Sequence, residues 1–253
     1  MGYLTEHAWK ALLLRVGIDK GTGGALGPIF EDDTFEYIPI PEKSSNTKEN
    51  RTYKDLFDRY GNSLSTYLPE VIGNKVIHFD PEFETFTYGD PTSKRNALLQ
   101  FKKDDLLVFY AGLTQYKKND EYKKGLYIIG YFTVEKVIDF CKLTDENVER
   151  CFQRYPNNAH LKRSYESKQE MREITGERLG LVMVVGDKKG SEILKKAILI
   201  SEPRKDKKER TYQAVSKEME ALLGIQGSIQ KSVPPRFIRE EKNLSNLKDK
   251  LGV

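Results

Sequence analysis

Runs of apolar residues along the chain predict a β-sheet built from a few strong strands. Residues 10–17 (KALLLRVG) form a short apolar run that ends at a glycine, which is typical of a buried strand. Residues 105–110 (DLLVFY) and 125–139 (GLYIIGYFTVEKVID) carry the strongest strand signals, and residues 179–185 (LGLVMVV) predict a further buried strand. We therefore expect these segments to form the core.

Helical patterns lie between and after these strands. Thr144, with Asn147 three residues later, predicts the N-cap of a helix over residues 144–154. Short helices are also predicted at 191–196, at 212–223 before Gly224, and in a basic segment after Pro234 and Pro235. This mixture favours an α+β fold, with one domain over residues 1–253, a mixed sheet flanked by helices, and a basic, helical C-terminal part at 203–253.

Charge is unevenly distributed along the chain. The 253 residues include 42 Lys and Arg and 38 Asp and Glu, a net charge of +4. Residues 203–253 hold twelve basic and seven acidic side chains, a net of +5, which leaves 30 basic and 31 acidic residues in 1–202. The basic C-terminal fifth favours contact with a polyanion, although Lys- and Glu-rich helices are also common as solvated faces.

The composition also limits the cellular setting and the cofactors. No apolar run approaches the roughly 18–20 residues of a membrane span, and residues 1–16 do not form a signal peptide, so we expect a soluble, cytoplasmic protein without a membrane partner. Cys141 and Cys151 lie ten positions apart without a CxxC motif, which argues against a thiolate-bound metal. The high Lys and Glu content is compatible with a heat-adapted host.

A glycine-rich loop at residues 17–28 (GIDKGTGGALGP) follows the first predicted strand. Clustered glycines let backbone N–H groups approach a phosphate. However, the loop has no Gly-Lys-Ser/Thr, opens no predicted helix, and resembles the phosphate loop of sugar kinases without their second motif. Two interpretations stay open: a loop that holds phosphate, or tight turns against another strand. The candidate ligand-binding residues here are Arg15, Gly21, Thr22, Gly23, Gly24 and Pro28.

Histidine and aspartate form a second candidate cluster, at residues 78–81 (HFDP). On an extended strand His78 and Asp80 point to the same side, and this pair can bind a metal or move protons. Tyr88 and Asp90 follow and could complete a polar pocket, while His160 stands at a predicted helix start. A metal needs at least three converging ligands and the local spacing offers two, so we expect neither metal nor cofactor. The alternative is a surface turn capped by Asp80.

Aromatic residues on the strongest strands allow two interpretations. Phe109 and Tyr110 lie on one strand, and Tyr127, Tyr131 and Phe132 lie on the next. They predict either ordinary sheet core or an aromatic slot that stacks a base, with Phe109 and Tyr110 as the candidate ligand contacts.

Several short motifs, taken in order, resemble a known family. They are Arg15-x-Gly-x-Asp19-x-Gly-Thr-Gly-Gly with Gly-Pro28-Ile-Phe, His78-x-Asp80-Pro, the 105–110 strand, Asn158-Ala-His160-Leu, and Ser232-Val-Pro-Pro-Arg236. Over residues 10–240 the chain resembles the nucleotide-modification-associated domain of the third type, found in archaea, bacteria and viruses. The resemblance implies a role near modified nucleobases and points to a set of site residues: Arg15, Asp19, Thr22, Gly23, Gly24, Pro28, His78, Asp80 and His160.

The chain departs from that family pattern at two places. Ala111-Gly112-Leu113 stands where a Trp-containing stretch is expected, and Glu82 stands where a second Asp is expected. The 105–110 strand and the glycines after it also resemble base-recognising small barrels. That similarity implies that the sheet is partly barrel-like.

Three hypotheses about function follow from these features. The first is a protein that binds nucleic acid (DNA or RNA) or a nucleotide, with phosphate on the glycine loop and the basic end on the backbone. The second is an enzyme acting on a nucleotide or base, with His78 and His160 as acid and base and Asp19 or Asp80 as orienting carboxylate. The third is a non-catalytic interaction scaffold. The second requires Asp19, His78, Asp80 and His160 to converge, and above all the two histidines to lie within reach of one another.

Overall fold

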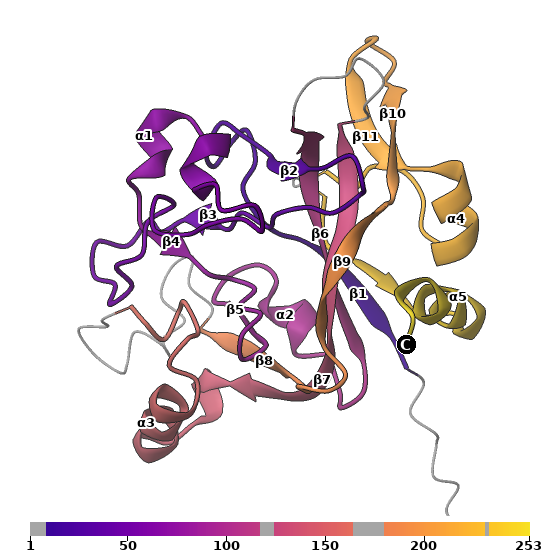
Figure 1. Ribbon diagram of the computed structural model, residues 1–253. Coiled ribbons are helices and arrows are strands. Elements are labelled where there is room, and N and C mark those ends of the chain that lie inside the picture. Colours follow the sequence, from indigo (N-terminus) through magenta and orange to yellow (C-terminus); the bar gives the residue numbers. More distant parts are fainter. Residues whose placement is uncertain (1–8, 117–123, 164–179, 231–232) are drawn as a thin grey trace, which may run out of the picture.

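One eight-stranded sheet runs through the molecule. The computed structural model describes residues 9–116, 124–163, 180–230 and 233–253. The strands follow the order β12-β1-β6-β7-β8-β5, with β2 paired to β6 and β9 paired to β7 (Figure 1). The predicted α+β class is confirmed. In the described part of the chain the sheet is open at β12 and β5 rather than closed into a barrel.

The two longest strands form the centre of this sheet. β6 (Leu106–Gln115) and β7 (Gly125–Asp139) pair antiparallel, as their strong apolar patterns predicted. β1 (Ala11–Arg15) and β2 (Gly27–Ile29) both lie parallel to β6. The remaining strands of the sheet are β5 (Thr87–Asp90), β8 (Val182–Gly186), β9 (Glu192–Leu199) and β12 (Arg236–Ile238).

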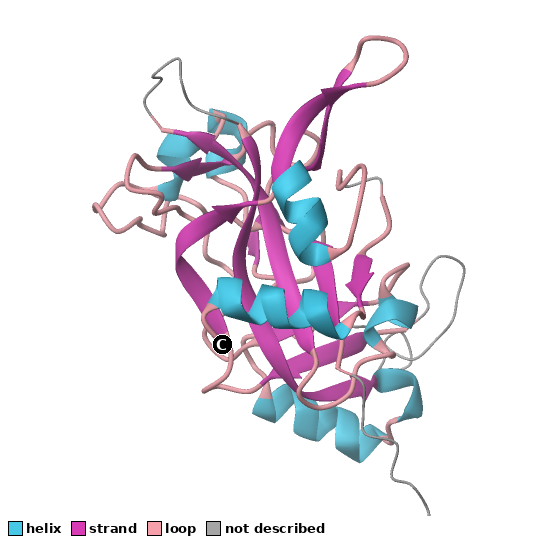
Figure 2. Cartoon of the chain, turned by 90° about the vertical axis from the view of Figure 1, so that its right-hand side faces the viewer, coloured by secondary structure: helices cyan, strands magenta, loops and turns pink. Residues whose placement is uncertain are grey.

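Both faces of the central strands are buried, which explains their nearly continuous apolar sequences. Successive side chains of a strand point to opposite faces. In β1, Ala11 and Leu13 belong to one core cluster, whereas Leu12 and Leu14 belong to the other. The helices α4 (Lys217–Leu223) and α5 (Glu241–Leu251) cover the first of these faces (Figure 2).

The helix predicted over 144–154 is confirmed as α3 (Asp145–Arg154). The Thr144 hydroxyl accepts a hydrogen bond from the Asn147 N–H, the N-cap arrangement that the sequence indicated. Val148 and Cys151 are buried against β8.

One predicted helix was wrong, and two others begin later than predicted, in each case because a strand forms there. Residues 191–196 lie mainly in β9, which pairs with β7. The predicted helix over 212–223 begins only at Lys217, because residues 211–215 are the strand β11 (Thr211–Val215). After Pro235 the chain first forms β12 against β1, and α5 starts at Glu241. A further helix, which the sequence predicts over about 159–174, falls mostly outside the described residues.

Two small sheets complete the structure. β3 (Ile40–Pro41) pairs with β4 (Ile77–His78), and β10 (Ser201–Lys205) pairs with β11 in a hairpin that projects from the top of the molecule in Figure 1. The short helices are α1 (Glu70–Gly73) and α2 (Arg95–Leu98), with 3-10 turns at Leu64–Tyr67 and Phe140–Lys142. No helix in the described ranges is long and apolar enough to cross a membrane.

Candidate functional site

His78, Asp80 and His160 lie together beside the edge strand β5. The two imidazole rings have centroids 4.9 Å apart and stand nearly perpendicular, at 84°. One ligand atom from each of the three residues lies within 4.8 Å of the others. His78 ends β4, Asp80 follows two residues later, and His160 comes from the loop after α3. The convergence that the enzyme hypothesis requires of the two histidines is therefore present.

Glu42 orients the ring of His78. It follows β3, whose pairing with β4 places Ile40 opposite His78. The Nδ1 atom of His78 lies 2.7 Å from Oε2 of Glu42. The side chain of Glu42 is only 2% exposed, and its Oε1 atom accepts hydrogen bonds from the backbone N–H groups of Lys43 and Ser44. The carboxylate is thus held in one position.

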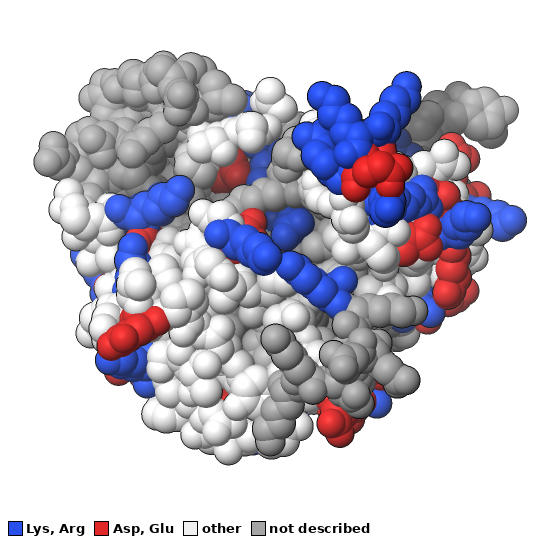
Figure 3. Space-filling model, turned by 90° about the horizontal axis from the view of Figure 1, so that it is seen from above, with Lys and Arg blue, Asp and Glu red and all other residues white. Residues whose placement is uncertain are grey.

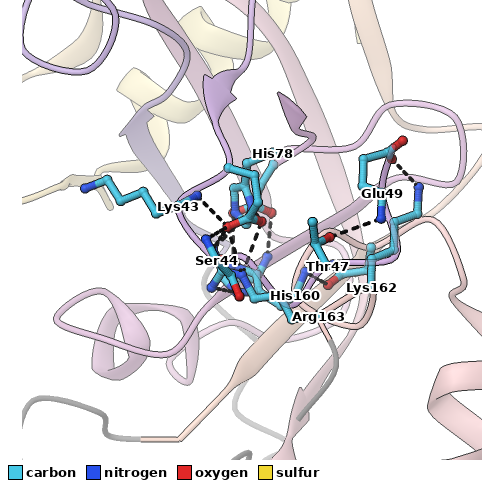
Figure 4. A network of polar contacts seen from close by, with 12 residues as sticks. Lys43, Ser44, Thr47, Glu49, His78, His160, Lys162 and Arg163 are labelled. Atoms are coloured by element: carbon cyan, nitrogen blue, oxygen red, sulfur yellow. Dashed lines mark hydrogen bonds and ion pairs between the residues drawn. The ribbon is translucent and has the colours of Figure 1, made fainter. Parts of the chain in front are cut away.

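Arg163 completes the polar network drawn in Figure 4. Its Nη2 atom donates to Oε1 of Glu42 at 2.7 Å, and its Nε atom lies 3.2 Å from both oxygens. The same guanidinium approaches Nδ1 of His160 at 3.5 Å. The N–H of Lys48 donates to the Lys162 carbonyl at 2.7 Å, so the segments around 42–49 and 160–163 are joined side by side.

The surroundings of Glu42 and His78 set the charge of these two side chains. Burial alone would raise the pKa of Glu42, but hydrogen bonds from His78 and Arg163 outweigh it and hold the pKa well below its usual range. Burial lowers the pKa of His78, and the hydrogen bond to Glu42 offsets this only in part. A neutral His78 that donates from Nδ1 to an ionised Glu42 carries a lone pair on Nε2. No hydrogen bond between described residues uses that Nε2 atom.

The side chains of Asp80 and His160 both form hydrogen bonds with the backbone of Gly89 in β5. The Gly89 N–H donates to Oδ1 of Asp80 at 2.9 Å, and the Gly89 carbonyl lies 3.0 Å from Nε2 of His160. Oδ2 of Asp80 lies 3.5 Å from that same Nε2 atom. A Cβ atom on residue 89 would lie 2.7 Å from Cδ2 of His160, so only glycine allows the ring to approach the strand this closely.

Asn158 holds the loop that carries His160. Its side chain is fully buried, and its Oδ1 atom accepts from the N–H groups of His160 and Leu161. Its Nδ2 atom donates to the Thr87 hydroxyl at 3.0 Å, which ties the loop to β5. The Asn158-Ala-His160-Leu161 motif thus serves to fix the loop that presents His160.

The glycine loop closes on its own aspartate. Oδ1 of Asp19 accepts from the N–H groups of Gly21 and Thr22 and from the Thr22 hydroxyl, at 2.8–2.9 Å. The Asp19 carbonyl accepts from the N–H groups of Thr22 and Gly23. The N–H groups of Gly21, Thr22 and Gly23, which are candidates for phosphate contact, thus already have partners.

The other loop residues have structural surroundings. Gly24 has a φ of +72°, a left-handed conformation that favours glycine. A Cβ on Gly27 would lie 2.8 Å from the Glu36 carbonyl, so this glycine permits close approach to another segment. Arg15 ends β1 and Pro28 pairs with Thr114 in the sheet. A phosphate role for this loop stays a prediction.

The remaining predicted residues lie in the core or in local contacts. Phe109 is fully buried, and Tyr110 is buried with its hydroxyl donating to the Ile229 carbonyl. Their rings belong to the sheet core, the first of the two interpretations above. Tyr88 accepts a hydrogen bond from Lys94 and is buried in β5, while Asp90 accepts from the N–H and hydroxyl of Thr92.

Glu42 and Arg163 were not among the site residues predicted from the sequence. Glu42 follows a short edge strand and Arg163 stands in a charged segment, and neither belongs to a motif. The only local signal is that Arg163 comes three residues after His160. The contacts that reveal them cross 36 and 121 positions of sequence.

The fold and the cluster define an α+β protein with a buried histidine–carboxylate site. Residues 10–231 match the family described as nucleotide modification associated domain 3, and the chain belongs to this family. It is therefore associated with nucleotide modification. No curated protein and no solved structure matches the chain.

Proposed function

We propose that the chain is an enzyme that acts on a nucleotide, free or within a nucleic acid, at the cluster of Glu42, His78, Asp80, His160 and Arg163. The observation that carries the proposal is the convergence of His78, Asp80 and His160 within 4.8 Å. Titratable groups brought together from distant segments and oriented by buried partners are characteristic of active sites. Membership of a family associated with nucleotide modification supports a nucleotide as the substrate.

The contacts support distinct tasks for four of the five residues. His78 presents the lone pair of Nε2 to the reacting group, and Glu42 fixes the ring and its tautomer. Asp80 presents Oδ2 beside His160, since Gly89 holds the other oxygen. Arg163 keeps Glu42 ionised and positioned. Such a site can accept a proton or hold an electrophile.

A basic hairpin supports a polymeric substrate. β10 and β11 project from the sheet, and Figure 3 shows Lys and Arg side chains gathered where this hairpin faces the viewer. Lys205 and Arg210 pair with Glu209 and Asp206 within the hairpin. Two exposed side chains at its tip, those of Lys207 and Lys208, have no ion pair among the described residues. We propose that this hairpin contacts a nucleic-acid backbone.

Product analysis by mass spectrometry tests the proposed function. The full chain is incubated with nucleotides, DNA and RNA, together with a small-molecule filtrate of host cells that supplies co-substrates. All samples are then digested to nucleosides. We expect a mass change in one nucleoside with the wild type and with His7→Gln, a control outside the described residues, and none with His78→Gln. Equal activity of His78→Gln would overturn the assignment, as would no mass change with any substrate.

Salt dependence tests the hairpin. Binding to DNA or RNA should weaken with rising salt, because cations on the protein release counterions from the phosphates. Replacing Lys207 and Lys208 by Glu should lower the salt slope of the affinity by about two, one unit for each lost phosphate contact. An unchanged slope would exclude the hairpin from the interface.

A further inference from the structure

We infer that His78, Asp80 and His160 form a binding site for one divalent transition-metal ion. The inference deepens the proposed function, since it names the cofactor class of the same site, but it rests on its own geometry. The three residues come from β4, the turn after it, and the loop after α3. Their ligand atoms nevertheless lie within 4.8 Å of one another.

The spacing of the ligand atoms suits a single ion. Metal–ligand bonds of about 2.0–2.2 Å allow two ligands of one ion to lie no more than about 4.4 Å apart. The largest separation allowed by the 4.8 Å limit therefore needs to close by only a few tenths of an ångström. Side-chain rotation can supply that change without moving the strands.

The outer contacts are those that orient metal ligands. A ligating histidine almost always donates its other ring N–H to a carboxylate, a carbonyl or water. Glu42 accepts from Nδ1 of His78, which leaves Nε2 for the ion. The Gly89 N–H occupies Oδ1 of Asp80 and leaves Oδ2 toward His160. In His160 the Gly89 carbonyl accepts from Nε2–H, which leaves Nδ1 for the ion on the side of Arg163. Each of the three ligands thus has its second polar atom held in place.

The charge of Asp80 gives an independent reason to expect a metal ion at this site. Its side chain is 8% exposed, and its ion-pairing partner among the described residues is the imidazole of His160, 3.5 Å away, which carries a charge only when protonated. Arg163, which belongs to the same network, forms its ion pair with Glu42. Buried charges in proteins are normally paired or coordinate a metal. Burial is the main cause of the raised pKa of the neighbouring Tyr37, and the charge of Asp80 raises that pKa further.

The donor set selects the class of metal. Two imidazoles and one carboxylate suit zinc and the other first-row ions such as iron(II), manganese and cobalt, whereas magnesium and calcium prefer oxygen ligands throughout. Three protein ligands leave coordination positions open. A nucleotide phosphate, a base carbonyl or water could occupy them next to the reacting group.

Metal titration of the tag-free full chain tests this site. We use Zn²⁺ and Co²⁺ as probes, with calorimetry for affinity and the visible absorption of bound Co²⁺ for coordination. We expect one equivalent of each metal to bind to the wild type and to His7→Gln. His78→Gln and His160→Gln should bind at least about 100-fold more weakly, since loss of a ligand should exceed the 10–100-fold loss seen for outer-shell partners. Equal binding by these two variants, or no binding by the wild type, would overturn the site.

X-ray absorption of the zinc-loaded wild type keeps the test valid if a variant fails to fold. Two imidazole nitrogens in the zinc shell are expected, and a shell without imidazole contradicts the proposal. Failure of the metal site is distinguishable from failure of the proposed function. If chelated wild type retains full nucleotide activity, the metal site fails and the function stands. If the metal binds but no nucleotide is altered, the metal site stands and the proposed function fails.

Discussion

The glycine loop at 17–28 and the histidine cluster both stand out in the sequence, but they use their polar groups in opposite ways. In the loop, Asp19 accepts N–H groups of residues two and three positions ahead, so the polar groups satisfy one another locally. In the cluster, Glu42, His78 and Arg163 meet from three separate segments and leave Nε2 of His78 without a hydrogen bond to a described residue. A loop that closes on itself stabilises the fold, whereas a cluster with unused donor atoms is available to a ligand.

Replacing the aspartate of the cluster should have the largest effect. In Asp80→Asn the site loses its only predicted anionic ligand, so metal affinity and nucleotide activity should fall at least about 100-fold. The Gly89 N–H keeps an acceptor, and therefore the melting temperature should change little. Calorimetric metal titration and product mass spectrometry measure the effect. Retention of both properties would show that Asp80 is structural, like Asp19.

Replacing the orienting carboxylate should have a smaller effect. Glu42→Gln removes the charge that fixes the His78 ring, and an outer-shell change of this kind costs about 10–100-fold in metal affinity. Glu49→Gln is the matched control, because Glu49 is also a buried carboxylate with cationic partners, Arg51 and Lys162, but has no hydrogen bond to a histidine among the described residues. Equal losses in the two variants would mean that the effect reflects general destabilisation.

A methyl group on β5 should displace His160. In Gly89→Ala the new Cβ meets the His160 ring at 2.7 Å, so the ring must move, at a cost of about 1–3 kcal/mol in stability and with weaker metal binding. Gly21→Ala in the glycine loop has room, with Oδ1 of Asp19 at 3.4 Å as the nearest contact. Denaturant unfolding and metal titration compare the two. Similar behaviour would contradict the tight packing of His160.

Removing the aspartate of the loop should affect stability alone. Asp19→Ala leaves two N–H groups and one hydroxyl without their acceptor, which should cost about 1–2 kcal/mol in the free energy of unfolding. Nucleotide binding and metal affinity should stay within about twofold of wild type. If nucleotide binding is lost while the protein remains folded, the loop is a ligand site and the contrast with the cluster is wrong.

The smallest effect concerns pH. Although burial opposes it, hydrogen bonds from Arg51 and Lys162 lower the pKa of Glu49 from 4.5 to about 2. A carboxyl with a lowered pKa in the folded state contributes stability that is present above pH 4.5 and lost as the pH falls toward 2. The stability difference between wild type and Glu49→Gln should therefore shrink over this range in acid denaturation curves. A difference that stays constant with pH would show that the charge of Glu49 does not contribute to the stability of the folded state.

Strand patterns were more informative than helical ones. β1, β6, β7 and β8 were all indicated by apolar runs, because strands buried on both faces need such sequences. The sequence of β9 (EILKKAIL) instead spaces its apolar residues as a helix does, yet pairing with β7 makes it a strand. Propensity is a weak signal where a neighbouring strand offers a full set of hydrogen bonds.

The sequence by itself determined the strong strands, the capped helix α3, and the identity of His78, Asp80 and His160 as candidates through short motifs. Only the tertiary structure decided that these three meet, that Glu42 and Arg163 complete their surroundings, and that Asp19 closes the glycine loop instead. The reason is the range of the interactions. Caps and strand patterns act over a few residues, whereas the contact between Glu42 and Arg163 spans 121 positions and exists only once the chain has folded.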